Sequence, residues 1–211
     1  MLWRSTAPAR RPPGFIEPCL PTNGHTVPTG AQWVYEIKHD GFRFICRRDG
    51  ELVRVYSRRG NDYTDRVPVI ADALAGLKVK SVTLDGEGVV CRADGVSDFD
   101  RLRAAVGRMG SRDAFLYAFD LLELDGENMR PYEWHVRRAT LRSLLKRVGP
   151  GIRLSEHLDG DGGLAFQLAC RMGLEGSVAK RRDKPYRSGR SPDWIKVKNP
   201  DAPAATRIME W

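Results

Sequence analysis

The chain has 211 residues, of which 41% are hydrophobic and 29% charged, as is typical of a folded domain with a sizeable core and unlike a disordered chain. No apolar run approaches the ~20 residues that a membrane-spanning helix requires, and residues 1–13 lack the apolar stretch of a secretory signal, so no membrane partner is expected. Its 35 Lys and Arg exceed its 27 Asp and Glu by eight, which favours polyanionic partners such as nucleic acid.

Strands are expected over much of the first half. Trp33, Tyr35 and Ile37 alternate with polar residues, which predicts a strand with one apolar face and with Glu36 and Lys38 on the other. The next strands, 42–48 and 52–57, flank Asp49-Gly50, a favoured hairpin turn. A helix over 67–77, a strand over 82–91 and a helix over 99–107 follow.

The second half begins with an apolar strand, 114–124, that ends at Asp125-Gly126. The clearest helix is 136–148, for which the helical period predicts an inward face of Leu141, Leu144, Leu145 and Val148, and an outward face of Arg137, Arg138, Arg142 and Lys146. A strand over 152–158, a helix over 164–172, and strands over 177–180 and 194–198 complete the chain. The class is therefore α+β, with largely antiparallel β-sheets packed with helices.

A single folded domain is expected over residues 15–200, because no internal repeat and no long linker divides it. Residues 1–14 form an Arg- and Pro-rich arm, and 201–211 a C-terminal tail. The cysteines show no CxxC spacing and the histidines no HxxxH pattern, so we expect buried thiols in a reducing cytoplasm and no zinc site.

The residues that could take part in a chemical reaction are lysines and carboxylates at strand ends. No GxxxxGK[ST] loop and no GxGxxG after a strand is present, so neither common phosphate-binding loop is predicted. Lys38 lies just before a glycine turn, and Lys196 and Lys198 share one face of a late strand. Taken singly, each of these lysines fits an ordinary solvated strand face.

Taken together, six segments resemble the motifs of the covalent nucleotidyltransferases, the superfamily of DNA ligases, RNA ligases and capping enzymes. The first, Lys38-His39-Asp40-Gly41-Phe42-Arg43, resembles KxDGxR. The others follow in the family's order: Ser57-Arg58-Arg59-Gly60, Leu84-Asp85-Gly86-Glu87, Tyr117 to Leu122, Glu175 to Lys180 and Trp194 to Lys198. The FDLL, EGxVAKR and DWxKVK phrases are similar to those of bacterial ATP-dependent DNA ligases of the end-joining type, although Ser177 stands where a bulkier aliphatic residue is usual.

The resemblance implies an ATP-grasp-like adenylation domain that acts in DNA repair and recombination. In such enzymes a lysine takes AMP from ATP, AMP passes to a DNA 5′-phosphate, and a 3′-hydroxyl then displaces it. ATP, Mg²⁺ or Mn²⁺, and nicked or broken double-stranded DNA are the expected cofactors and partners. The chain ends soon after Lys198, so no OB-fold domain is expected in it, and an OB-fold or end-joining partner would act in trans.

The resemblance also assigns roles to individual residues. Lys38 is the expected nucleophile, Glu36 and the backbone at Ile37 would recognise the adenine edge, and Phe119 would stack on the base. Arg43 and Glu87 would hold the ribose. Lys180, Lys196 and Lys198 would bind the α-phosphate. Glu87 and Glu175 would bind the metal, and Arg58 and Arg59 would bind DNA.

Two other classes stay open on the sequence alone. An RNA ligase or a GTP-using capping enzyme would carry the same lysine, because base choice depends on a few contacts around Glu36 and Phe119. A non-catalytic paralogue that only binds nucleotide or DNA is the third alternative. Mere binding needs no nucleophile, so the intact lysine and carboxylate set favours an enzyme.

Overall fold

Two β-sheets form the framework of the fold in a computed structural model of the chain, which describes residues 11–107 and 112–202. The first sheet contains β3 (Phe42–Asp49), β4 (Leu52–Ser57), β5 (Ser81–Val89), β6 (Phe115–Leu124), β7 (Glu127–Asn128) and β8 (Ile152–Leu154). The second contains β1 (Cys19–Asn23), β2 (Trp33–Ile37), β9 (His157–Leu158), β10 (Gly176–Arg181) and β11 (Gly189–Lys198).

The strand order shows how the sheets are assembled. The first sheet has the order β4-β3-β5-β6-β7, with β8 paired to β6, and the second has the order β1-β11-β10-β2-β9. Only the β1–β11 and β6–β8 pairs of the described strands are parallel. The α+β expectation with largely antiparallel sheets is therefore confirmed within the described residues.

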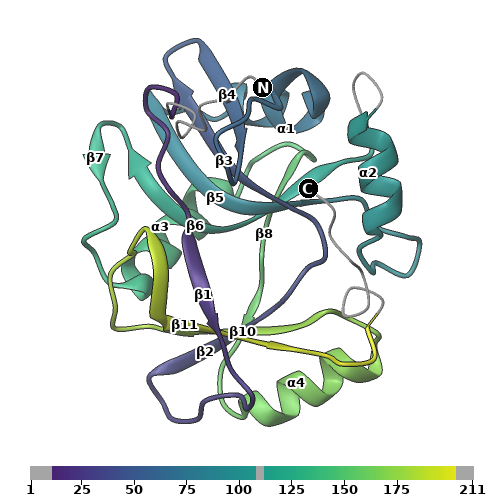
Figure 1. Cartoon of the computed structure of the whole chain (residues 1–211). Coiled ribbons are helices and arrows are strands. Elements are labelled where there is room, and N and C mark those ends of the chain that lie inside the picture. Colours follow the sequence, from purple (N-terminus) through teal and green to yellow (C-terminus); the bar gives the residue numbers. More distant parts are fainter. Residues whose placement is uncertain (1–10, 108–111, 203–211) are drawn as a thin grey trace, which may run out of the picture.

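Helices cover both sheets (Figure 1). They are α1 (Pro68–Ala75), α2 (Phe99–Gly107), α3 (Trp134–Leu145) and α4 (Gly162–Arg171), with a 3₁₀ turn, η1, at Thr64–Arg66. The main core lies under the first sheet, where Leu84 and Leu116 pack with Leu74 of α1, Leu102 of α2 and Leu141 of α3. Helix α4 packs against β10 and β2 of the second sheet. No helix in the described ranges is long and apolar enough to cross a membrane.

Three local expectations about strands and turns are corrected. The segment 152–158 is two strands, because β8 pairs with β6 of the first sheet while β9 pairs with β2 of the second. The hairpin turn lies one residue later than expected, at Gly50-Glu51, since Asp49 pairs with Leu52. Gly50 has φ +57°, and glycine favours this value at the first position of a type II′ turn. Strand β1 was not predicted.

The outward face expected for α3 is also wrong in part. Arg137 is fully buried and Arg138 is 4% exposed, whereas Val136 is 36% exposed. The reason is a carboxylate inside the fold: Arg137 donates from Nε and Nη2 to the two oxygens of buried Asp120 on β6, at 2.6 and 2.9 Å. A helical wheel places arginine on the surface, but a buried acid draws it inward because a buried charge needs a partner.

The domain boundaries stay predictions at both ends. Of the expected arm, residues 1–10 lie outside the described part of the chain, and Arg11 pairs with Glu17 at 2.9 Å. Of the expected tail, residues 203–211 also lie outside it. Within it, Ala202 is buried and donates its N–H to Asn199.

Candidate functional site

A cleft of about 790 Å³ receives side chains from both sheets. Strands β2, β10 and β11 of the second sheet contribute to it, as do β3, β5 and β6 of the first. Every site residue expected from the sequence lines this cleft: Glu36, Ile37, Lys38, Arg43, Arg58, Arg59, Glu87, Phe119, Glu175, Lys180, Lys196 and Lys198. Residues as far apart in the chain as Glu36 and Lys198 are thus brought to one place, as an active site requires.

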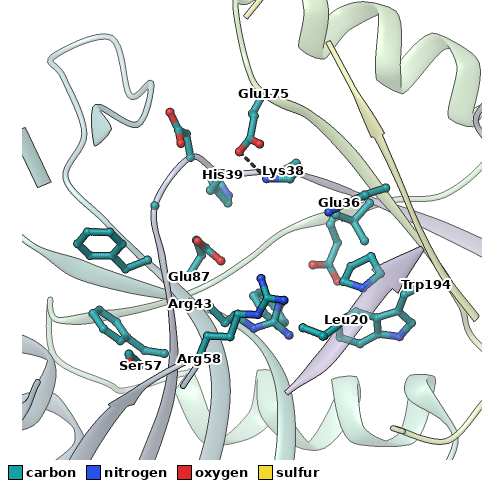
Figure 2. A pocket seen from close by; sticks show the side chains of 18 of the residues that line it. Leu20, Glu36, Lys38, His39, Arg43, Ser57, Arg58, Glu87, Glu175 and Trp194 are labelled. Atoms are coloured by element: carbon teal, nitrogen blue, oxygen red, sulfur yellow. Dashed lines mark ion pairs between the residues drawn. The ribbon is translucent and has the colours of Figure 1, made fainter. Parts of the chain in front are cut away.

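Lys38 lies directly after β2, where its N–H donates to the carbonyl of Gly176 at 3.0 Å. Its Nζ is 2.5 Å from a carboxylate oxygen of Glu175, and Figure 2 shows this pair at one end of the site. The lysine side chain is 21% exposed, so it is accessible from the cleft. A Cβ on Gly41 would lie 2.2 Å from the carbonyl oxygen of Gly88, which explains why glycine follows so closely after the lysine.

Glu87 occupies β5 opposite Arg43 of β3. Burial raises the pKa of its carboxyl to about 7, and the positive charges of Lys38 and Arg43 oppose that rise. Like-charge repulsion from Glu175 raises the pKa of Glu87 further, so the two carboxylates interact electrostatically. The described residues contain no cluster of three or more His, Cys, Asp or Glu side chains suited to a metal. Glu87 and Glu175 together provide two carboxylates at the lysine end.

Arg43 has partners that sequence reasoning did not assign. Its guanidinium donates to both oxygens of Asp85, at 2.5 and 2.7 Å, and to the carbonyl of Cys19 at 3.2 Å. Tyr186 donates its hydroxyl to the same carboxylate at 2.6 Å. Asp85 lies two residues before Glu87 on one strand, so the period-two pattern placed both on one face and was the available signal. The guanidinium also lies 4.3 Å from the centre of the Phe119 ring.

Glu36 and Lys180 form a buried ion pair with 2.9 Å between Lys180 Nζ and a carboxylate oxygen. Burial raises the pKa of Glu36 and lowers that of Lys180, while their mutual attraction opposes both changes. The ammonium lies 4.3 Å from the Phe119 ring centre and 4.1 Å from that of Trp194. Sequence reasoning missed Trp194, although it quoted the segment that contains it.

The alternation expected for β2 agrees with the structure in that Glu36 and Lys38 both line the cleft, but the burial of its residues differs from the expected pattern. Tyr35 is buried, but Ile37 on the same side of the alternation is 37% exposed, and Glu36 is only 4% exposed. The physical reason is that Lys180 and Ser155 contact the Glu36 side chain and cover it. Helix α4 packs on β2 as well, with Gly162 against the Tyr35 ring. Neither side of this strand is a solvated face.

Cations line the side of the cleft formed by β11. Partial burial lowers the pKa of Lys196, and the positive charges of Lys38, Lys198, Arg190 and Arg58 lower it further. Arg58 and Arg59 lie on the turn after β4 and are exposed, at the rim of the same cleft. Figure 2 shows Arg58, Arg43, Glu87 and Glu36 among the residues that line the site. The arrangement suits a phosphate group held near an amine.

Comparisons with known proteins show the family of the chain. Residues 23–198 match the model of the ATP dependent DNA ligase domain. The chain is 39% identical over 187 residues to a multifunctional non-homologous end joining protein LigD of Pseudomonas aeruginosa, covering 88% of this chain and 22% of that protein. It is 30% identical over 190 residues to a prophage-derived DNA ligase-like protein, LigB, of Bacillus subtilis, covering 89% of this chain and 68% of that one.

A solved structure of a mycobacterial DNA ligase D, complexed with ATP and MES, is similar with a TM-score of 0.73 and 36% identity. The alignment covers 86% of this chain and 59% of that one. A Chlorella virus DNA ligase-adenylate shares the fold at 18% identity, with a TM-score of 0.60 and coverage of 87% and 68%. The chain spans about a quarter of the length of the LigD proteins that it matches. The chain therefore belongs to the family of ATP-dependent DNA ligase domains.

Proposed function

We propose that this chain is the catalytic domain of an ATP-dependent DNA ligase of the end-joining type, with Lys38 as its nucleophile. The neutral Lys38 amine attacks the α-phosphorus of ATP, the bond from that phosphorus to the β-phosphate oxygen breaks, and pyrophosphate leaves. AMP then passes from the lysine to a DNA 5′-phosphate, and a 3′-hydroxyl displaces it as the strands join. The observation that supports this most directly is the accessible Lys38 amine beside two carboxylates and a row of lysines in one cleft.

The cations of the cleft favour such a reaction, because they stabilise the negative charge that builds on the transferring phosphoryl group. We assign Lys180, Lys196 and Lys198 to the α-phosphate.

The walls of the cleft suit the nucleoside. We assign Glu36 and the backbone at Ile37 to the adenine edge, Phe119 to the base, and Arg43 and Glu87 to the ribose. The Phe119 ring is buried beside two cations, so a base that stacks there would meet a rigid surface. The Asp85 carboxylate accepts hydrogen bonds from the Arg43 guanidinium and so keeps the guanidinium over the Phe119 ring.

Glu87 and Glu175 fit a magnesium or manganese ion that is held mainly by the substrate. Magnesium usually binds one or two carboxylates together with phosphates and water, so two carboxylates are a sufficient donor set. When bound, the ion would neutralise charge on the triphosphate. Glu175 pairs with Lys38 at 2.5 Å, a pair that the neutral Lys38 amine of the attacking state would no longer hold, which leaves the Glu175 carboxylate for the ion.

Nicked or broken duplex DNA is the proposed substrate. Arg58 and Arg59 are exposed at the rim, where side chains can contact a DNA backbone without filling the nucleotide site. Domain closure by an OB-fold or an end-joining partner in trans, and a cytoplasmic location, stay predictions.

Intact-mass measurement of the purified chain after incubation with ATP and Mg²⁺ tests the first step. We expect a gain of one adenylyl group, reversed by pyrophosphate, and no gain for Lys38→Ala. Lys78→Ala, which removes a lysine outside the cleft, is the matched control and should label like the wild type. Equal labelling of Lys38→Ala would refute the nucleophile, and preferential labelling by GTP would favour the capping-type alternative.

A further inference from the structure

Behind Glu36 lies a second buried cation, Arg138 of α3, which is 4% exposed. Its Nη2 donates to the carbonyl oxygen of Ser155 and lies 4.0 Å from the exposed carboxylate of Glu156. The Ser155 hydroxyl in turn points to Glu36, 3.4 Å from the second carboxylate oxygen. Ser155 thus connects Arg138 to the carboxylate at the wall of the cleft.

Two donors of this guanidinium are unused. Nε and Nη1 of Arg138 are buried and have no hydrogen-bond partner among residues 11–107 and 112–202. Buried donors are nearly always paired, so a pair left open calls for a physical account. The charge of Arg138 already lowers the pKa of Glu36, second only to Lys180 among the cations that act on it. His157 lies opposite Glu36 in the β2–β9 register, but burial lowers its pKa, so Arg138 is the cation on that side at neutral pH.

The proposed function creates a conflict at Glu36 that this second cation resolves. Lys180 donates to Glu36 at 2.9 Å, and an ATP α-phosphate bound by the same ammonium would compete with Glu36 for its charge and its donors. Glu36 would then be a buried carboxylate whose first counter-charge is shared with the phosphate. An unpaired buried carboxylate is strongly disfavoured and would take up a proton. A protonated Glu36 would offer one acceptor less to the amino group of adenine.

We propose that Arg138 is a positioning residue that determines base specificity: it becomes the counter-charge of Glu36 when Lys180 moves to the triphosphate, and so keeps Glu36 an acceptor for the 6-amino group of adenine. The inference rests on the proposed function, because it presumes that Glu36 faces the adenine edge. The Nε and Nη1 donors of Arg138, which have no hydrogen-bond partner among the described residues, allow it to take over as the partner of Glu36. Arg138 itself does not touch the nucleotide.

The test compares two nucleotide donors that differ only in the group that Glu36 recognises. Formation of lysyl-AMP, or its analogue, is measured as kcat/KM with ATP and with purine riboside triphosphate, which lacks the 6-amino group. We expect Arg138→Met to lower the preference for ATP about tenfold, the range of one hydrogen bond to a charged group. Its efficiency with the analogue should stay near that of the wild type, and Arg138→Lys should retain part of the preference.

Arg142→Met is the matched control, because Arg142 lies one turn further along α3, is exposed, and faces the same Glu156. It should keep the full preference. In a Glu36→Gln background, Arg138→Met should change the preference no further, since a neutral amide needs no counter-charge. An equal loss of efficiency with both donors in Arg138→Met would mean a merely structural role and overturn the inference. Arg138→Gln gives the same comparison if the Met variant folds poorly.

The outcome also separates this inference from the function on which it rests. If the wild type forms no lysyl-AMP, the proposed function and the inference both fail. If the wild type labels with a preference for ATP and Arg138→Met and Arg138→Gln keep that preference, only the role of Arg138 is refuted.

Discussion

Replacing Arg137 with Met is expected to destabilise the fold by about 3–5 kcal/mol, the usual cost of removing one partner from a buried ion pair. Arg137 and Asp120 are 0% and 1% exposed, so water cannot take the place of the lost guanidinium. The pair has two direct hydrogen bonds, and Arg137 Nη1 also donates to the carbonyls of Tyr132 at 2.5 Å and Lys184 at 3.3 Å. In the variant, the bond from the N–H of Leu121 would be the one hydrogen bond left to the Asp120 side chain among the residues that the structure describes.

Urea unfolding at pH 7 and thermal unfolding both measure this change. In a chain of this size each kcal/mol shifts Tm by about 2–4 °C, so Arg137→Met should lower Tm by roughly 6–20 °C. Arg142→Met removes an exposed arginine of the same helix and should change stability by less than about 0.5 kcal/mol. Adding Asp120→Asn to Arg137→Met should recover part of the loss, because the unpaired charge is gone. A loss below about 1 kcal/mol in the single variant would refute the reasoning.

Three further predictions concern stability, pH and DNA. Ser177 is 3% exposed, and its hydroxyl has no hydrogen-bond partner among the described residues, so Ser177→Val should raise the free energy of unfolding by about 1 kcal/mol in urea; no gain would contradict this. His39 stacks on Tyr117 at 4.0 Å, and burial, aided by Lys38, lowers its pKa to about 4. Between pH 6.5 and 4 the unfolded state therefore binds one proton more than the folded state. As the pH is lowered through that window, the free energy of unfolding should decrease by up to about 1.4 kcal/mol per pH unit. His39→Gln should make this slope smaller. Arg58→Ala should keep lysyl-AMP formation but weaken binding to nicked DNA at moderate salt and lower the salt slope by about one; an unchanged affinity would count against a DNA role.

The strands that build the site were largely predictable, because alternation and glycine turns are local features. Lys196 and Lys198 were expected on one face of their strand, and both line the cleft. Local pattern could not reveal which strands become neighbours. The Glu36–Lys180 pair joins residues 144 positions apart, and it depends on β10 lying beside β2 in the sheet. A polar face was therefore expected where a buried ion pair stands.

Helix α3 shows that local pattern also predicts the burial of its residues incompletely. Its period was correct for Leu141 and Leu145, which are buried, because apolar residues have one favourable location. Arginine has two favourable locations: it is solvated on the surface, or it is buried where an acceptor is available to pair with it. Asp120 on β6 creates such a place for Arg137, and the carbonyl of Ser155 accepts from Arg138, so both arginines turn inward. Only the packing of α3 against β6 and β8 decides between the alternatives.

The two ion pairs at the cleft have one arrangement in common. Lys38 pairs with Glu175 at 2.5 Å and Lys180 pairs with Glu36 at 2.9 Å. In each pair we assign the lysine to the α-phosphate, as nucleophile or as ligand, and the carboxylate to another group, the metal for Glu175 and the adenine edge for Glu36. These pairs keep the charges of the site balanced, which avoids the cost of unpaired buried ions. A triphosphate that enters would compete with both carboxylates for the lysines. The carboxylates released would then face the adenine amino group and the metal. Phosphate binding and base recognition would in this way be coupled, so a ligand that carries only one of the two groups should bind more weakly than the sum of its contacts implies.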